Sequence, residues 1–199
     1  SLQDFGSEAE LIPLLTPEDE EEMNNEELPK NLAILPLRNM VLFPGVVIPI
    51  TAGRDKSIRL INEANAEGKI IGVVAQKNEE DEDPTKNDIH KIGTVAKILR
   101  VLKMPDGNVT VILQGKKRFE IDTVITENPY IRAEVKEVSE KRPSKHDTEF
   151  VAIVDSIKEL AIQIIKESPN IPSEATFAIK NIESQSFLTN FVTSNMNLS

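Results

Sequence analysis

Residues 32–138 carry the hydrophobic patterns of a β-rich fold. Aliphatic or alternating runs occur at residues 32–37, 46–50, 70–75, 92–104, 108–113, 119–125 and 130–138. Together these runs predict about six strands. Pro36 and Pro49 interrupt the first two runs, which places those strands at edges, bends or bulges. Residues 105–108, Pro-Asp-Gly-Asn, indicate a hairpin. One helix is predicted at residues 54–66, because its apolar residues gather on one face and Gly68 follows it.

The pattern changes to a helical period after residue 143. Apolar residues recur at helical spacing from Phe150 to Ile164, behind a Ser144 and Asp147 pair with the spacing of a capping box. Pro172 is expected to open a second helix, and residues 184–194 to form a third. We therefore predict an α+β protein: a small barrel or a pair of packed sheets with one helix, followed by a helical subdomain of about 50 residues.

The net charge of −10 is concentrated at one end of the chain. Ten of the 33 acidic residues and one of the 23 basic residues lie in residues 1–30, so residues 31–199 are close to neutral. An acidic segment interrupted by proline buries little apolar surface, which predicts a mobile acidic leader at 1–30. The β-rich subdomain is then expected at 31–140 and the helical one at 141–199. A broad basic field for nucleic acid is excluded.

Composition also limits the chemistry of the chain. The absence of Cys excludes disulfides, thiolate metal sites and cysteine nucleophiles, and His90 and His146 lack neighbours at metal-ligand spacing. The sequence contains no phosphate-binding glycine loop, no GxSxG elbow and no HExxH, so no catalytic residue, metal site or cofactor is predicted. No run reaches the ~18 apolar residues of a membrane helix, and no signal peptide pattern opens the chain. We expect a soluble cytoplasmic protein with no membrane partner.

Three charged or titratable features of the sequence are candidates for sites. The acidic run at residues 78–84 lacks the alternating ligands and turn glycine of a calcium loop, which favours a solvated loop. Lys116-Lys117-Arg118 could touch phosphate, but no aromatic residue is interleaved with it, which favours an ordinary exposed turn. His90 and His146 are interpreted as surface or capping residues.

Several blocks of residues occur in the order and spacing of one known family. The first is Leu35-Pro36-Leu37-Arg38-Asn39-Met40-Val41-Leu42-Phe43-Pro44-Gly45. The others are Ile48-Pro49, Gly53-Arg54-Asp55-Lys56-Ser57-Ile58, Val74-Ala75-Gln76-Lys77, Gly93-Thr94-Val95-Ala96-Lys97-Ile98, Leu102-Lys103-Met104-Pro105-Asp106-Gly107 and Gln114-Gly115-Lys116-Lys117-Arg118. Through these blocks residues 32–138 resemble the N-terminal domain of Lon-type ATP-dependent proteases. Ile171-Pro172 and Ile182-Glu183-Ser184 extend the resemblance, whereas Leu188-Thr189-Asn190 and the acidic leader depart from it.

The resemblance implies a PUA-like β-rich subdomain followed by a helical bundle. It also implies a longer cytoplasmic parent, a homohexamer whose ATPase module, with ATP and Mg, and Ser-Lys protease module lie outside these residues. The short final helices agree with a chain that continues past Ser199. In that family the N-terminal domain is non-catalytic, helps select unfolded, damaged or tagged proteins, and helps the ring assemble.

A receptor for unfolded chains needs exposed apolar area flanked by charge. We therefore single out one candidate surface, composed of Met40, Phe43, Pro44, Arg54, Asp55, Lys56 and Arg59. The competing interpretation is that the apolar members are core residues and the charges at the helix start are merely solvated. The alternatives for function are a stand-alone LON-domain binding module and, less favoured because of the near-neutral charge, a PUA-like RNA-binding module. An independent enzyme is the least favoured.

Overall fold

The computed structural model describes residues 15–138, 143, 147–168 and 174–195. The chain divides into two compact units, which are described separately below. One unit combines Ser1–Glu22 with Glu140–Ser199, and the other is Met23–Ser139.

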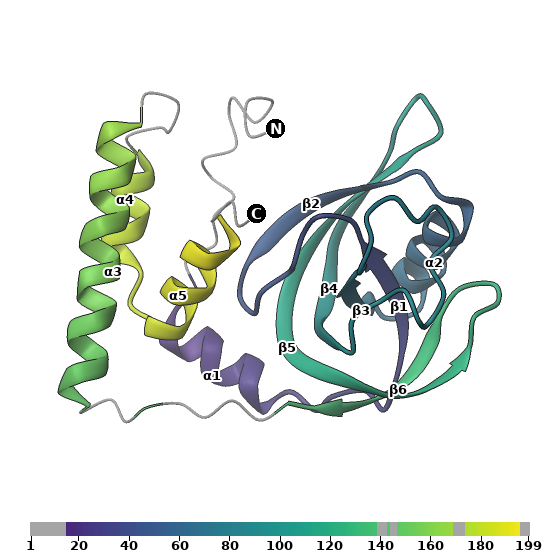
Figure 1. Cartoon of the computed structure of the whole chain (residues 1–199), viewed down its shortest axis with the longest axis horizontal. Coiled ribbons are helices and arrows are strands. Elements are labelled where there is room, and N and C mark those ends of the chain that lie inside the picture. The colour runs from purple at the N-terminus through teal and green to yellow at the C-terminus, as the bar shows by residue number, and fades with distance from the viewer. Residues whose placement is uncertain (1–14, 139–142, 144–146, 169–173, 196–199) are drawn as a thin grey trace. The chain divides into compact units, whose positions relative to one another are not determined.

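The unit Met23–Ser139 is built on a six-stranded sheet in the order β2-β5-β4-β3-β1-β6, in which β5 also pairs with β6 (Figure 1). Its strands are β1 (Asn31–Leu37), β2 (Val47–Ala52), β3 (Ile70–Ala75), β4 (Ile92–Lys103), β5 (Val109–Thr126) and β6 (Arg132–Glu137). Strands β1 and β3 are parallel, and all other pairs are antiparallel. Because β5 pairs with both β4 and β6, the sheet closes on itself. The predicted β-rich barrel or sheet is confirmed.

Strand β5 closes the sheet because it changes its partner along one edge. Its first residues, from Val109 to Gln114, pair with β2, and those from Phe119 to Thr126 pair with β6. Along the other edge it pairs with β4 from Val109 to Glu120. The prediction of two separate strands at 108–113 and 119–125 was therefore wrong. The polar residues 114–118, which resembled a break between strands, lie where the continuous strand passes from one partner to the other.

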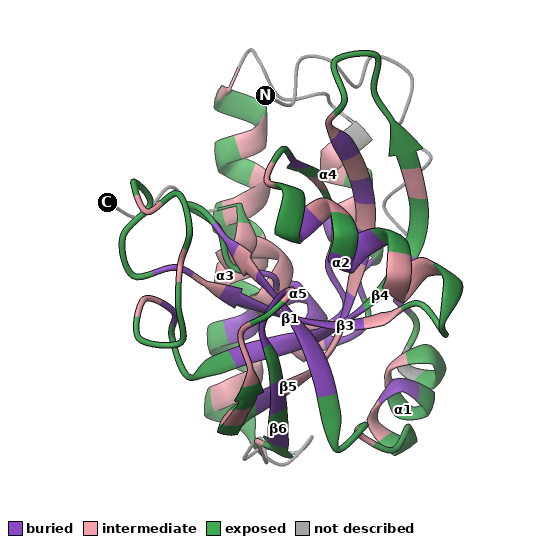
Figure 2. Cartoon of the chain, turned by 90° about the vertical axis from the view of Figure 1, so that its right-hand side faces the viewer, coloured by how far each residue is buried: buried purple, intermediate pink, exposed green. Residues whose placement is uncertain are grey.

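The core of this unit surrounds Phe119, which is fully buried. Its buried cluster consists of Leu32, Ile34, Val74, Ile89, Val95, Phe119, Ile131, Ala133 and Val135 (Figure 2). A Cβ added to Gly72 or Gly93 would lie 2.8 Å from Phe119 Cζ, so these two glycines make room for the ring. Burying each large apolar side chain of this cluster contributes roughly 1.5–3 kcal/mol to the stability of the unit.

Helix α2 (Asp55–Ala66) packs on β1, β3 and β4. It buries Ser57, Leu60 and Ile61. The helix ends where Lys69, with φ of 64°, donates its N–H to Ala64 O at 2.9 Å. Lys69 O in turn accepts from Ile98 N at 2.7 Å, which ties the end of the helix to β4. The helix predicted at 54–66 is confirmed, with Arg54 as its N-cap residue.

Glu63 joins α2 to the chain that enters β6. Tyr130 donates its hydroxyl to Glu63 Oε2 at 2.6 Å, and Arg59 Nε donates to Glu63 Oε1 at 2.8 Å. The hydrogen bond from Tyr130 lowers the pKa of Glu63, and the bond from Arg59 adds to this effect. Burial raises the pKa of Tyr130, and the hydrogen bond to Glu63 raises it further. The phenol of Tyr130 therefore stays neutral while the carboxylate stays charged.

The chain between β1 and β2 ends in a tight turn followed by a β-bulge. Val46 N donates to Phe43 O at 3.1 Å across this turn. Pro44 and Gly45 occupy its centre, and the φ of 80° at Gly45 is that of a type II turn. Gly45 N then donates to Gly115 O, and Gly115 N donates to Val46 O, both at 2.9 Å. Two residues thus oppose one, with glycine at positive φ, which defines a G1 bulge.

Helix α1 (Pro17–Asn25), which the sequence analysis did not predict, lies within residues 1–30 and spans the division between the units. Thr16 and Asp19 cap its start reciprocally, because each side chain accepts a hydrogen bond from the other residue's backbone N–H at 3.1 Å. Pro17 suits the first helical position, and acidic residues suit the first turn of a helix. The acidic residues and the prolines led to the prediction of a mobile leader, but both residue types are also common at the start of a helix.

The other unit contains α3 (Thr148–Glu167), α4 (Glu174–Asn181) and α5 (Gln185–Ser194). Asp147 caps α3 by accepting from Phe150 N at 3.1 Å; the predicted capping-box serine, Ser144, lies outside the described residues. Ser184 caps α5 by accepting from Phe187 N at 3.0 Å and donates its own hydroxyl to Glu20 of α1. Buried apolar side chains join the helices: Val154, Ile179, Ile182, Phe187 and Leu188. The predicted helical subdomain is confirmed.

Substitution of Gly115 tests the fit at the bulge. A Cβ there would lie 2.2 Å from Phe43 O, so Gly115→Ala should lower the free energy of unfolding of the barrel unit by about 2–3 kcal/mol. Urea unfolding followed by fluorescence of Tyr130, the single tyrosine, measures this unit. The control is Gly107→Ala, which has open space and only a positive φ, and should cost about 1 kcal/mol. Equal losses in the two variants would contradict the packing account.

The contact of Tyr130 with Glu63 predicts an unusual titration. The single tyrosine of the native chain should ionise above the ordinary range for tyrosine, because burial and the neighbouring carboxylate both raise its pKa. Glu63→Gln removes the carboxylate charge, so the midpoint in a spectrophotometric titration should move to lower pH. Glu79→Gln, on an exposed loop, serves as the control and should leave the midpoint unchanged. An unchanged midpoint in Glu63→Gln would show that the contact does not form in solution.

Candidate functional site

The apolar part of the candidate surface is only partly exposed. Met40 and Val41 are 38% and 54% exposed, whereas Leu42 is 2% exposed. Phe43 and Pro44 are half-buried in the turn. Thr94 Oγ1 donates to Leu42 O at 2.6 Å and fixes the backbone there. In this stretch Leu42 is therefore a core residue, whereas Met40 and Val41 are exposed. Val41, the most exposed of them, had not been singled out.

Phe43 also contacts a cation of strand β5. The guanidinium carbon of Arg118 lies 5.9 Å from the centroid of the Phe43 ring, within cation–π range. Arg118 belongs to the basic triplet that was predicted to form an exposed turn. That prediction was wrong, because all three residues lie within β5 and are half-buried. Lys116 pairs with Glu26 at 3.1 Å, and Lys117 pairs with Glu137 at 3.2 Å.

Arg54 connects the start of α2 to two other segments. Its Nη2 donates to Pro36 O at 3.1 Å, near the end of β1, and its Nη1 lies 3.5 Å from Glu82 O. Burial lowers the pKa of Arg54, and the nearby Arg38 lowers it further, while Glu82 and Asp83 act in the opposite sense. By bridging these two carbonyl groups, the half-buried guanidinium of Arg54 holds the end of β1 and residue Glu82 near the start of α2.

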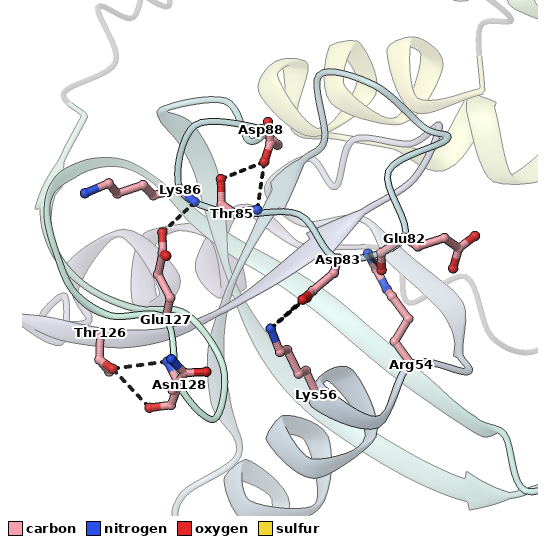
Figure 3. A network of polar contacts seen from close by, with 10 residues as sticks. All are labelled: Arg54, Lys56, Glu82, Asp83, Thr85, Lys86, Asp88, Thr126, Glu127 and Asn128. Carbon is pink, nitrogen blue, oxygen red and sulfur yellow. Dashed lines mark hydrogen bonds and ion pairs between the residues drawn. The ribbon is translucent and has the colours of Figure 1, made fainter.

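Residues 78–84 supply acidic partners for the neighbouring cations (Figure 3). Lys56 Nζ lies 2.7 Å from Asp83 Oδ1, and Arg38 Nη2 lies 3.2 Å from Glu82 Oε2. Both pairs are exposed, and such pairs contribute about 0–1 kcal/mol each. The loop is exposed, as the sequence predicted, but its acidic residues face a complementary group of cations. Arg38, Glu82 and Asp83 are thus members of the site that sequence reasoning missed.

The same loop is also held at its far end. Thr85 donates its hydroxyl and its backbone N–H to Asp88 Oδ2, at 2.6 and 2.9 Å, and these bonds lower the pKa of Asp88. Lys86 N donates to Glu127 Oε1 at 2.9 Å, next to the turn between β5 and β6 (Figure 3). Residues 78–88 therefore contact the start of α2 through Asp83 and the turn that follows β5 through Lys86.

The remaining predicted charges are distributed differently. Asp55 is exposed in the first turn of α2, where a carboxylate favours the helix N-terminus. Arg59 pairs with Glu63 rather than with the acidic loop. The structure thus brings Arg54 and Lys56 together with Arg38, close to the end of β1 from which Met40 and Val41 follow. Arg59 belongs instead to the contact with Tyr130.

The sequence predicted no metal site, and the part of the chain that the structure describes can be compared with that expectation. Within those residues no three His, Asp or Glu side chains are placed to hold a metal ion. His90 is exposed, and His146 lies outside the described residues. None of the described helices has the length and apolar character needed to span a membrane.

Comparisons with known proteins agree on one family. Residues 31–199 match the family model for the substrate-binding domain of ATP-dependent protease La (LON). The chain is 83% identical over 199 residues to a Lon protease of Flavobacterium johnsoniae, covering 100% of this chain and 24% of the relative. It is 51% identical over 188 residues to a Lon protease of Cytophaga hutchinsonii, covering 94% of this chain and 23% of that protein. The chain thus spans about a quarter of the length of these curated relatives.

A solved structure shows the same fold. The N-terminal domain of the Mycobacterium avium complex Lon protease superposes with a TM-score of 0.68 over 85% of each chain, at 20% sequence identity. The family model and the 83% identical relative confirm the resemblance inferred from the motifs at residues 35–45 and beyond. With a family model matched from β1 to the last helix and a relative that is 83% identical, the chain belongs to the family of Lon protease N-terminal substrate-binding domains.

Proposed function

We propose that this domain receives unfolded or damaged protein substrates on behalf of a larger ATP-dependent serine protease. The observation that carries the proposal is the pair of exposed apolar side chains, Met40 and Val41, beside a charged rim, in a domain of the substrate-binding family. Exposed apolar groups bind many sequences, and flanking charges steer the encounter. Of the charges predicted for this rim, Arg54, Asp55 and Lys56 lie at the start of α2 near Arg38, whereas Arg59 pairs with Glu63. Phe43 and Pro44 are half-buried.

The proposed parent supplies the chemistry that this chain lacks. Relatives about four times as long support a protein with ATPase and Ser-Lys protease modules beyond these residues, working with ATP and Mg as a cytoplasmic homohexamer. In that arrangement the domain delivers substrates, helps the ring assemble and performs no hydrolysis. The same length argues against a stand-alone binding module. The pairing of Lys116 and Lys117 with carboxylates argues against an RNA-binding surface at that triplet.

The size of the exposed patch implies weak binding by one copy. Burial of the area of Met40 and Val41 that is still exposed, 38% and 54% of the two residues, would contribute roughly 1–3 kcal/mol. Association costs at least about 4 kcal/mol in lost freedom of motion, so these two side chains alone hold one segment only weakly on one domain. Several copies in one ring would raise the effective concentration and hold one unfolded chain at several points. Weak individual contacts also allow release toward the rest of the machine.

Replacement of the two exposed apolar residues tests this function. The double variant Met40→Ser with Val41→Ser should bind a permanently unfolded test protein, reduced and carboxymethylated lactalbumin, about tenfold more weakly, since a loss of 1.4 kcal/mol is tenfold in affinity. Titration calorimetry or anisotropy measures the affinity, and tyrosine fluorescence checks that the fold is intact.

The matched control replaces two equally exposed aliphatic residues elsewhere on the same unit. Ile92 and Ile125 are 49% and 53% exposed, so Ile92→Ser with Ile125→Ser removes similar apolar area. This control should bind like the unaltered chain. Equal weakening in both double variants would show that general hydrophobicity, and no particular surface, governs binding. No weakening in the first variant would remove residues 40–44 from the proposal.

A further inference from the structure

The hairpin formed by β4 and β5 extends beyond its neighbour on one side. Strand β3 pairs with β4 only between residues 94 and 97, from Val73↔Thr94 to Ile70↔Lys97. The pairing of β4 with β5 continues to Lys103↔Val109. The tip of this hairpin projects beyond the other strands of the barrel unit (Figure 1). Residues 99–103 of β4 therefore have β5 along one edge and, among the described residues, no strand along the other.

The backbone groups that face the open edge follow from the neighbouring hydrogen bonds. Ile98 N donates to Lys69 O, on the β3 side, whereas Met104 N donates to Asn108 O, on the β5 side. A register shift lies between Ile98 and Arg100, so residues 100, 102 and 104 share one orientation toward β5. Alternate residues point the other way. The N–H and C=O groups of Val101 and Lys103 are thus directed to the open edge.

The side chains around this edge are apolar or cationic. Leu99, Leu102 and Met104 are 44%, 37% and 43% exposed. Lys97, Arg100 and Lys103 are exposed as well, and none of them has an acidic partner among the described residues. The cations at the start of α2 differ in this respect, because Lys56 and Arg59 are paired with carboxylates. The cations Arg100 and Lys103 therefore lie next to the backbone groups of Val101 and Lys103 that face the open edge.

We propose that the open edge at residues 99–104 binds an extended acidic polypeptide segment, which adds to β4 as a further strand. Main-chain hydrogen bonds to Val101 and Lys103 would supply affinity that does not depend on sequence. Arg100 and Lys103 lie on opposite faces of β4, so acidic residues on either face of the added strand meet a cation. The exposed Leu102, on the face of Arg100, accepts an apolar residue. Two copies of this edge would place like charges opposite each other, which disfavours self-pairing.

This surface is separate from residues 40–44, so the inference goes beyond the proposed function and does not depend on it. A domain with both surfaces would distinguish among unfolded segments by charge as well as by apolar content. Acidic segments would bind at the hairpin, and neutral apolar segments at Met40 and Val41.

Two labelled peptides test the charge selection. A nine-residue peptide of alternating Glu and Val should bind the whole chain at least tenfold more tightly than its counterpart with Lys for Glu, and added salt should reduce the difference. The double variant Arg100→Glu with Lys103→Glu should reverse this preference. Met40→Ser with Val41→Ser should leave it unchanged, which separates failure of this inference from failure of the proposed function. Equal binding of both peptides, or a double variant with unaltered preference, overturns the inference.

Two further changes test the strand pairing. N-methylation of alternate residues of the acidic peptide removes its hydrogen-bond donors on one edge, and methylation of the correct set should weaken binding at least tenfold. Val101→Pro removes the N–H that faces the open edge while leaving the bonds of β4 to β5, and should weaken binding similarly, with tyrosine fluorescence as the folding check. Undiminished binding of both methylated forms overturns strand addition. Preferential capture by anionic lipid vesicles, with no binding of the acidic peptide, would replace the polypeptide with a membrane surface.

Discussion

The contact between the turn at residues 43–46 and Gly115 is the constraint on which the barrel unit depends. In the bulge, backbone groups of Gly45, Val46 and Gly115 hydrogen-bond to one another at the point where β5 passes from β2 to β6. The long strand β5 can therefore pass from β2 to β6 with the N–H and C=O groups of Gly115 hydrogen-bonded at the crossing. The same contact fixes the orientation of the preceding residues, so that Leu42 is buried while Val41 is exposed.

Charge compensation divides the surface of this unit into two kinds of region. At the start of α2, cations pair with the acidic residues of the loop 78–84, and these pairs hold the loop near the end of β1. On the β4 hairpin, Arg100 and Lys103 have no such partners within the described residues. Because exposed pairs contribute little stability, the first arrangement is better explained by positioning, and the second leaves charge available for a ligand.

Local sequence patterns predicted most of the strands and helices, and the elements that they did not predict have physical explanations. The apolar runs located the strands, and Gly68 marked the end of α2, because burial and backbone conformation are local properties of these residues. The continuity of β5 across residues 114–118 depends on partners distant in sequence, which hydrophobic alternation does not encode. Helix α1 was missed because its charge and prolines also fit a segment without structure. The exposure of Met40 agrees with its choice from sequence as a candidate, whose role stays a prediction, but the pairing of Lys56 with Asp83 required the folded chain.

Amide hydrogen exchange by NMR at Gly45, Val46 and Gly115 tests the central claim most directly, namely that a pre-formed bulge holds the exposed apolar residues in place. Gly45 N and Gly115 N donate across the bulge, and Val46 N donates across the turn. Their exchange should be as slow as that of the central strands β3 and β4, with opening only through unfolding of the unit. Exchange at the rate of an open loop, with β3 and β4 still protected, would contradict the account.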